Sequence, residues 1–210
     1  HDTVEAYNIA NNRYVQIGIS PTGIYRNGDG NVTYDENGNA ISSGSCTGGQ
    51  EHYESYLFSD TVKWINEEWI DYIMPQSYWA FTHKIAGYAD VMSWWNKIVK
   101  YKNVNLYSGM GIYMWTSTAG EALAQLQISD SLENVKGTSI YSYKQVQQGY
   151  HSSNTQAKAQ MALVKSNMWK SKVVAPKVPH YNKPKYSSRL ALIDTALDFI
   201  KDKLFFTTLK

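Results

Sequence analysis

The stretch "WIDYIMPQSYW", residues 69–79, changes character at its middle. Its first half is apolar and rich in β-forming residues, which is typical of a buried strand. Its second half, residues 75–79, brings together a proline, an amide and two aromatic rings. Side chains that directly follow a strand of a parallel α/β protein lie at the edge where binding sites form. The stretch therefore predicts a buried strand over residues 70–75 that ends in a cluster able to stack and to hydrogen-bond.

Strands and helices alternate on both sides of this stretch. Strand character is found at residues 14–20, 70–75, 104–113 and 135–143. Helical character is found at residues 60–70, 88–101, 119–132 and 155–170. Strands that alternate with helices pair in parallel through right-handed crossovers, and four such units make half of a (β/α)8 barrel. An open doubly wound sheet is the alternative, although no glycine-rich phosphate motif follows any of the strands.

Two of the predicted helices have a clear apolar side. The side of the first helix carries Val62, Ile65 and Trp69. The side of the second helix carries Val91, Trp94, Trp95 and Ile98. Ser59 or Asp60 stands where the N-cap of the first helix is expected.

Residues 27–50 are rich in Gly, Asn, Asp and Ser and contain two turn signals, Asp29-Gly30 and Asn37-Gly38. They predict a β-hairpin carried on a long loop. Oxygen-bearing side chains alternate through this loop as they do in a calcium site, but the glycine and the distal glutamate miss the EF-hand positions. Turn chemistry is the better explanation, and we expect neither a metal nor a cofactor.

Composition bounds the class of protein. The 210 residues are enough for one sizeable core, and 43% hydrophobic with 18% charged residues indicates a globular chain. A net charge of +2 argues against a nucleic-acid partner. The single cysteine excludes an internal disulfide, and no run is long enough to span a membrane. Because the chain opens at His1 in what resembles a helix already under way, we expect a fragment or a processed product.

Aromatic residues are unusually frequent: seven Trp and 17 Tyr help to raise them to 14%. Several of them, with amides and one arginine, follow the ends of the four predicted strands; these are Tyr25, Arg26, Asn27, Gln76, Tyr78, Trp79, Tyr113, Trp115, Tyr141 and Tyr143. Rings pack on the apolar faces of sugars, and amides read sugar hydroxyls. We therefore predict a carbohydrate cleft at this edge. The alternative is that each ring only packs under a helix and that Arg26 only braces a loop.

Glycosidic hydrolysis normally needs two carboxyl groups, and no predicted strand here ends directly in Asp or Glu. Asp71 lies at the entry end of its strand, where a structural role is expected, and Asp60 is explained as a cap. Glu51 and Glu54 follow the first strand on the correct side, and Glu54 is the best candidate for a catalytic acid. The histidines lack the spacing of metal ligands, and Ser20 and Ser77 lack partners for a serine triad.

Three motifs carry a family resemblance. "IGISPTGIYRN", then "SYLFSDTVKWINEEWIDYIMPQSYW", then "WWNKIVKYKNVNLYSGMGIYMW" occur in one order, followed by "VKGTSIYSY". The chain resembles the glycosyl-hydrolase-like 10 family of bacterial envelope proteins over residues 10–170. The resemblance implies a (β/α)8 barrel with glycoside hydrolase activity, exported or lipid-anchored, with some members acting on peptidoglycan glycan strands. The positions that match its cleft motifs are Ser20, Pro21, Gly23, Arg26, Asn27, Asp60, Pro75, Gln76, Tyr78, Trp79 and Tyr113.

The resemblance also implies what is missing. Family members precede this region with four β/α units that carry an acidic strand end, so the chain would be the C-terminal half of the barrel. We expect residues 1–170 to form that half, residues 171–186 a proline-rich linker, and residues 187–210 a terminal amphipathic segment. The expected function is hydrolysis of a bacterial cell-envelope polysaccharide, outside the cell or in its envelope. The alternatives are a carbohydrate-binding barrel without catalysis and a half-barrel that self-associates or pairs with the missing half.

Overall fold

The protein, analysed as a computed structural model, contains a four-stranded parallel sheet in the order β1-β4-β5-β6. The structure describes residues 1–54, 57–114, 120–151 and 155–171. The strands are β1 (Gly18–Ile19), β4 (Tyr72–Ile73), β5 (Asn105–Gly111) and β6 (Val135–Tyr141). All four predicted strands are confirmed, with narrower bounds. The arrangement is that of part of a (β/α)8 barrel.

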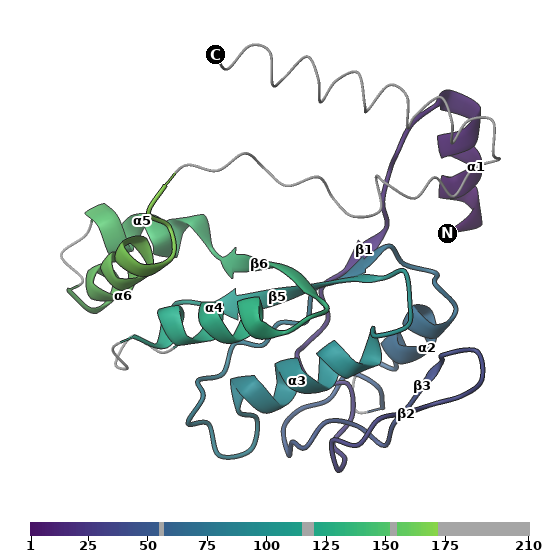
Figure 1. The fold of residues 1–210 in the computed structure, drawn as a ribbon, viewed down its shortest axis with the longest axis horizontal. Helices are drawn as coiled ribbons and strands as arrows, with labels where there is room; N and C mark the ends of the chain where they lie inside the picture. Colours follow the sequence, from purple (N-terminus) through teal and green to yellow (C-terminus); the bar gives the residue numbers. More distant parts are fainter. Residues whose placement is uncertain (55–56, 115–119, 152–154, 172–210) are drawn as a thin grey trace.

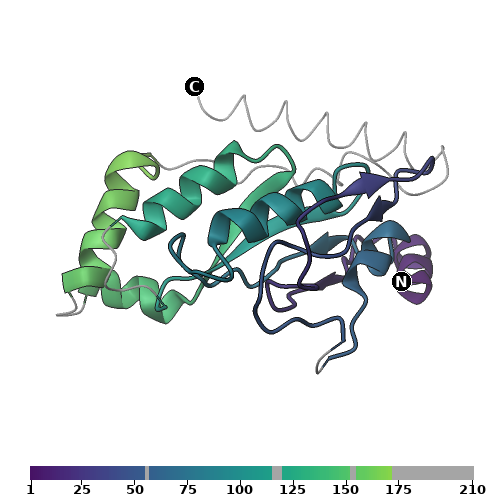
Figure 2. The same ribbon diagram turned by 90° about the horizontal axis from the view of Figure 1, so that it is seen from below.

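Helices cover one face of this sheet. α3 (Tyr88–Ile98) and α4 (Glu121–Ser131) run along its lower face in Figure 1 and lie in front of it in Figure 2. The remaining helices are α1 (Asp2–Asn11), α2 (Thr61–Asn66), α5 (Tyr143–His151) and α6 (Thr155–Asn167). α5 was not predicted; it begins at Tyr143, which the sequence analysis placed in the last strand. None of the described helices is both long and apolar enough to cross a lipid bilayer.

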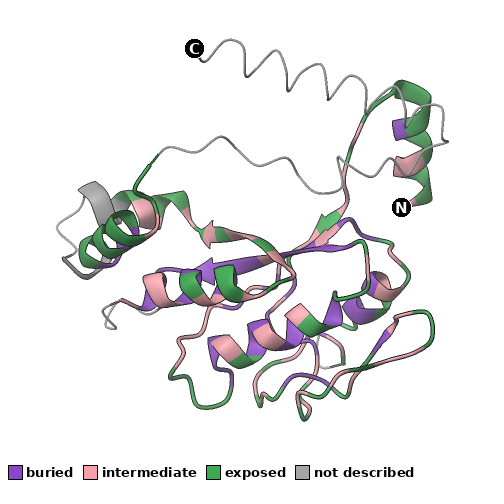
Figure 3. Ribbon diagram, viewed as in Figure 1, coloured by how far each residue is buried: buried purple, intermediate pink, exposed green. Residues whose placement is uncertain are grey.

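The core lies between the sheet and these helices. Alternate residues of β5 point toward the helices, and Leu106, Ser108 and Met110 are completely buried. Figure 3 shows β5 as largely buried, whereas the neighbouring β6 is half-buried or exposed. The predicted apolar side of α3 is confirmed, because all four residues named for it are buried; these are Val91, Trp94, Trp95 and Ile98.

The helix predicted over residues 60–70 is shorter than expected. α2 ends at Asn66, and Glu68 adopts a left-handed backbone conformation with φ of 52°. The chain therefore turns toward β4 before Trp69, whose amide donates to the Trp64 carbonyl at 2.9 Å. The prediction that Trp69 shares the buried side of this helix is wrong, since the residue is 45% exposed.

The predicted hairpin is confirmed. β2 (Thr33–Tyr34) and β3 (Ala40–Ile41) pair in antiparallel register. Asp35 closes the turn between them by accepting hydrogen bonds from the amides of Asn37 and Asn39 at 2.9 and 2.7 Å. The hydrogen bonds from Asn39 hold the pKa of Asp35 below its ordinary value. The carboxylate of Asp35 is thus engaged in turn formation.

The predicted linker begins at the edge of the described region. Of residues 171–186 only the first is described, and residues 187–210 lie wholly outside the described residues. The domain division remains a prediction.

Candidate functional site

Main-chain hydrogen bonds join the segments that follow β1, β4 and β5. The Gln76 amide donates to the Pro21 carbonyl at 2.9 Å, and the Ser77 amide donates to the Gly109 carbonyl at 2.9 Å. The Gln76 side chain donates through Nε2 to the Ser20 carbonyl at 2.8 Å. Three successive strand ends therefore form one continuous edge, and Gln76 lies at its centre.

Three tyrosine rings meet beyond this edge. The Tyr78 and Tyr141 rings are stacked with their centroids 6.0 Å apart, and Tyr113 meets both edge-on at 6.1 and 6.0 Å. We call these three residues the tyrosine rim. Tyr113 is 40% exposed and Tyr141 is 57% exposed, so ring surface remains open to solvent. Burial raises the pKa of Tyr78, so its hydroxyl stays protonated and can both donate and accept hydrogen bonds.

Gly111 provides the surface on which Tyr78 rests. A Cβ atom at this position would lie 2.7 Å from Cγ of Tyr78, which is closer than side chains approach. Gly109 plays a similar part for the backbone, because a Cβ there would lie 2.6 Å from the Pro75 carbonyl oxygen. The sequence analysis missed both glycines. The signal was available, since glycine inside a strand often marks close approach of another segment.

Trp79 is half-buried and joins the loop after β1 to the loop after β4. A Cβ at Gly23 would lie 2.7 Å from Cζ3 of the Trp79 ring. The Trp79 ring also lies near His83, with centroids 6.2 Å apart. Trp79 thus has a structural contact with the loop after β1, and the residue as a whole is half-buried.

The three residues predicted at the end of the first strand have different environments. Tyr25 is only 6% exposed, and its hydroxyl donates to Oδ1 of Asp60 at 2.9 Å. Burial and this hydrogen bond raise the pKa of Tyr25 well above its ordinary value. Asn27 ties its loop together, donating through its backbone and side-chain nitrogens to Glu51 Oε2 at 2.9 and 3.2 Å. Tyr25 therefore offers little surface for stacking, whereas Asn27 is exposed, and both support the loop that carries Arg26.

Arg26 lies beside the predicted acid. Its guanidinium is 3.5 Å from Oε1 of Glu54 and stacks over the Tyr53 ring at 4.7 Å. The Tyr53 ring in turn packs against buried Tyr25, with centroids 4.9 Å apart. Glu54 is 61% exposed, so this ion pair is solvated and contributes little to stability. Its effect is to keep a charged pair on the loop after β1.

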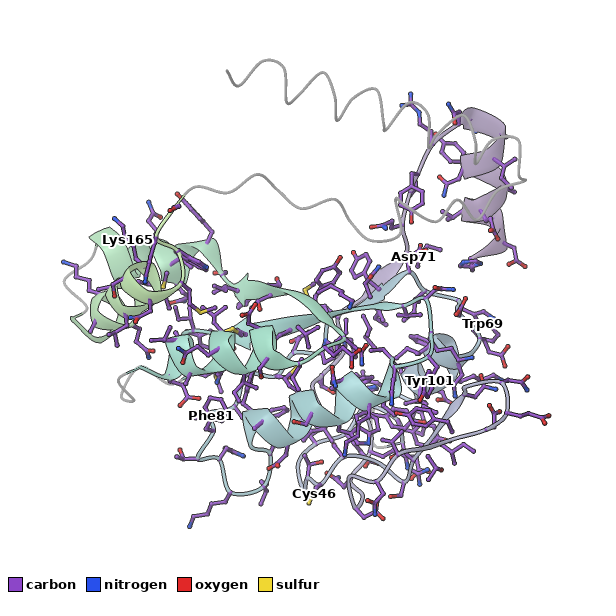
Figure 4. The ribbon with its side chains drawn as sticks, viewed as in Figure 1. Cys46, Trp69, Asp71, Phe81, Tyr101 and Lys165 are labelled. Atoms are coloured by element: carbon purple, nitrogen blue, oxygen red, sulfur yellow. The ribbon has the colours of Figure 1, made fainter. Side chains whose placement is uncertain are left out.

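Asp60 and Asp71, which lie just before α2 and just before β4, serve the fold. Asp60 caps α2 by accepting from the Lys63 amide at 3.0 Å, which decides between the two predicted caps. Asp71 accepts from the Ile17 amide at 2.8 Å, as expected of a structural residue. Figure 4 shows Asp71 and Phe81 at opposite ends of the sheet, so Asp71 lies far from the edge that carries the tyrosine rim.

Comparison with known proteins identifies the chain's family. The sequence model of the family described as glycosyl hydrolase-like 10 matches residues 4–122, which is more than half of the chain. The chain belongs to this family. The resemblance drawn from its motifs is confirmed.

Curated relatives of this glycosyl hydrolase-like 10 chain carry glycosyl hydrolase names. Glycosyl hydrolase YngK of Bacillus subtilis is 34% identical over 183 residues, covering 81% of this chain and 33% of that protein. Glycosyl hydrolase DigH of Escherichia coli O6:H1 is 32% identical over 139 residues, covering 60% of this chain and 29% of that protein. The chain therefore spans about a third of the length of the curated relatives it matches.

A buried histidine underlies the site in this family member. His52 is completely buried, and its two ring nitrogens are hydrogen-bonded to the hydroxyls of Thr22 and Thr61 at 3.1 and 2.8 Å. Desolvation lowers the pKa of His52 to about 4, so the ring is neutral at physiological pH. It joins the loop after β1 to the first turn of α2. Local pattern in the sequence gave no signal of the bridging role of His52.

A second buried network lies under the loop after β4. Gln125 of α4 donates through Nε2 to the Trp79 carbonyl at 3.0 Å and to Oε1 of Glu121 at 2.8 Å. The Phe81 amide donates to the same carboxylate oxygen at 2.9 Å. Gln160 of α6 accepts from the Ala122 amide at 2.8 Å and so caps α4. The sequence analysis assigned no role to Glu121 or Gln125, because the loop they hold is 40 residues or more away in the chain.

A cluster of possible metal ligands lies at the start of α1, away from the candidate site. In the described part of the chain, one group of possible ligands has its atoms within 4.8 Å of one another; it consists of His1, Asp2 and Glu5. These residues lie at the start of α1, and Asp2 is fully exposed. We assign no metal to them, since exposed acidic groups at the start of a helix commonly cluster without one.

Proposed function

We propose that this chain forms part of a glycoside hydrolase barrel that acts on a bacterial cell-envelope polysaccharide, such as the glycan strands of peptidoglycan. The tyrosine rim is the observation that carries the proposal. Its three rings come from three different strand ends, and two of them are at least 40% exposed. Aromatic faces at the carboxyl edge of a barrel sheet suit the apolar faces of sugar rings. A location outside the cell or in its envelope belongs to the same proposal.

The remaining polar groups suit the same ligand. Gln76 is held by Ser20 in a fixed position at the centre of the edge, and an amide can both donate to and accept from hydroxyls. Arg26 is 38% exposed and still has donors beyond its long contact with Glu54. We propose that Gln76 forms hydrogen bonds with a sugar hydroxyl. We propose that Arg26 binds a carboxylate on the glycan or its peptide substituents.

Hydrolysis requires a second carboxyl group in addition to Glu54. One carboxyl group protonates the leaving oxygen, while the other activates water or attacks the anomeric carbon. We propose that Glu54 supplies one and that a preceding half of the barrel supplies the other. Two observations support such a half: β1 and β6 stand at the two edges of the sheet, and the match with this chain covers only 33% and 29% of the two curated relatives. The same unpaired edges would explain self-association of the chain alone.

Ligand binding tests the proposal without the missing half. Chitotetraose, a soluble tetramer of N-acetylglucosamine, would be titrated into the 210-residue chain while intrinsic fluorescence is followed. We expect saturable binding that weakens about tenfold in Tyr113→Ala and in Tyr141→Ala, because each substitution removes one stacking face. Tyr101→Ala is the matched control, since Tyr101 is 55% exposed on the hairpin side of the molecule, far from Phe81 in Figure 4. Equal affinities for all four proteins would overturn the assignment of the rim.

Carbohydrate binding without catalysis is the second candidate. It is favoured by the engagement of the acids near the edge: Glu51 accepts from Asn27, Asp60 caps α2, and Glu54 is paired with Arg26. The full-length protein distinguishes the two candidates, because binding of glycan strands with no release of reducing ends would select the binding protein over the enzyme.

A further inference from the structure

We propose that Glu121 and Gln125 of α4 are positioning residues that fix Trp79 at the candidate site. Their part in glycan recognition rests on the function proposed above, whereas their action on Trp79 does not. They act through the backbone of the loop after β4.

Two atoms hold two backbone groups of this loop. Nε2 of Gln125 donates to the Trp79 carbonyl oxygen, and Oε1 of Glu121 accepts from the Phe81 amide. The same Nε2 also donates to the same Oε1, at 2.8 Å, so the amide and the carboxylate brace each other. Residues 79 and 81 are therefore both tied to the first turn and a half of α4.

Burial makes these contacts strong and specific. Glu121 is 4% exposed and Gln125 is completely buried, so the hydrogen bonds form away from water. The carboxylate sits at the first residue of α4, where the helix dipole favours a negative charge. Hydrogen bonds to a charged acceptor are roughly twice as strong as neutral ones.

The unpaired end of Gln125 points to the importance of its donor. In the described part of the chain, Oε1 of Gln125 is a buried oxygen without a hydrogen-bond partner. Both partners of Nε2 are acceptors, so turning the amide over would break two hydrogen bonds. An apolar residue would fill this position without burying an unpaired oxygen. The amide is explained by what its nitrogen holds.

Trp79 has a second constraint on its other side, where its ring lies against Gly23 in the loop after β1. The hydrogen bond from Gln125 to the Trp79 carbonyl and the contact of the Trp79 ring with Gly23 together restrict the indole to a single position. Release of the Trp79 carbonyl would let the ring move away from Gly23, and it would move the adjacent Tyr78 of the rim.

Fluorine NMR measures the position of Trp79 directly. The 210-residue chain would be labelled with 5-fluorotryptophan, and Trp79→Phe would assign the Trp79 resonance among those of the seven tryptophans. Glu121→Ala and Gln125→Met remove the contacts, and Glu121→Gln keeps an acceptor at the same place. Leu126→Ala is the matched control, because Leu126 is a buried residue of the same helix with no hydrogen bond to the loop.

We expect Glu121→Ala and Gln125→Met to shift or broaden the Trp79 resonance more than the other tryptophan resonances. Glu121→Gln restores the wild-type spectrum at Trp79, and Leu126→Ala lowers stability without moving that resonance. An unmoved Trp79 resonance in Gln125→Met and Glu121→Ala overturns the proposal. If Glu121→Ala does not fold, Gln125→Met alone decides, since it removes the donor together with the unpaired Oε1 and roughly preserves side-chain volume.

Chitotetraose affinity separates this proposal from the proposed function. We expect the dissociation constant to rise about tenfold in Glu121→Ala and in Gln125→Met, and less than twofold in Glu121→Gln and Leu126→Ala. A displaced Trp79 with unchanged affinity overturns the role in recognition and leaves the positioning intact. If the wild-type chain binds no chitotetraose, the proposed function fails, and the NMR result still decides whether Glu121 and Gln125 fix Trp79.

Discussion

The ring of Tyr78 rests directly on the backbone of Gly111, where an added Cβ would stand 2.7 Å from Cγ of the ring. One strand end thus provides the floor for a side chain that comes from the neighbouring strand end. The tyrosine rim depends on this contact, since Tyr78 is the ring that stacks on Tyr141 and meets Tyr113.

Gly111→Ala should displace Tyr78. We expect a loss of about 1–3 kcal/mol in the free energy of unfolding, typical of a methyl group forced into a filled space. We also expect weaker glycan binding. Urea unfolding and chitotetraose titration measure the two effects. Gly137→Ala is the matched control in the adjacent strand, because a Cβ there would lie an ordinary 3.4 Å from Tyr107. Equal losses of stability and of glycan binding in Gly111→Ala and Gly137→Ala would contradict the role of Gly111 in supporting the Tyr78 ring.

His52 should make stability depend on pH. Its folded-state pKa of about 4 is below its ordinary value of 6.5, so the unfolded chain binds more protons between these values. Stability from the neutral ring is fully present above pH 6.5 and is lost as the pH falls toward 4, by a total on the order of 3 kcal/mol.

Urea unfolding at several pH values between 7 and 4 measures this loss. We expect His52→Gln to flatten the pH dependence, whatever its effect at neutral pH. His83→Gln serves as the control, since His83 is exposed and lies outside the buried hydrogen bonds of His52 with Thr22 and Thr61. A wild-type slope that survives in His52→Gln would assign the effect to other groups.

Asp60→Ala should be more costly than the loss of an ordinary helix cap. Asp60 accepts from both the Lys63 amide and the buried Tyr25 hydroxyl. We expect the free energy of unfolding to fall by about 1 kcal/mol for the lost cap. We expect a further loss of about 1–3 kcal/mol because the buried Tyr25 hydroxyl is left without its acceptor. Ser59→Ala, at the neighbouring half-buried position, removes only a hydroxyl that donates to the Leu57 carbonyl, and should change the free energy of unfolding by no more than about 1 kcal/mol. Thermal or urea unfolding measures the loss. A loss of only about 1 kcal/mol, as expected for the cap alone, would show that the Tyr25 hydroxyl finds another partner.

Glu54→Gln tests catalysis in the full-length protein. If Glu54 is a catalytic carboxyl group, we expect release of reducing ends to fall by at least about a hundredfold while glycan binding persists. Glu36→Gln is the control, because Glu36 is an exposed acid in the hairpin turn. A rate within about threefold of wild type would remove Glu54 from the mechanism and direct the search to other acids.

Local patterns in the sequence predicted much of the fold. The strand-helix alternation, the hairpin and the buried side of α3 follow from spacing and turn residues, which are local properties. Trp69 and α5 were predicted wrongly or missed, because a single backbone reversal at Glu68 and a strand-to-helix transition near Ser142 override local preference. Pattern marks where an element is, but less precisely where it ends.

The candidate site was predicted only in part. Residues that follow strands could be named from order alone, and the ring contacts bring Tyr78 and Tyr113 together as expected for one edge. The supports were not foreseen: His52, Gly111, Glu121 and Gln125 act through partners that are distant in the chain. Tyr25 illustrates the opposite error, since its position after the strand suggested exposure whereas its ring is core.

The backbone beneath the rim has a consequence for how such proteins diversify. The edge is joined by main-chain groups, such as the amides of Gln76 and Ser77 with the carbonyls of Pro21 and Gly109, and these are present whatever side chains stand there. Tyr113 and Tyr141 are each carried by a separate strand. A single codon change can therefore exchange one ring while the scaffold persists, so new ligand preferences can arise in steps, each of which still folds.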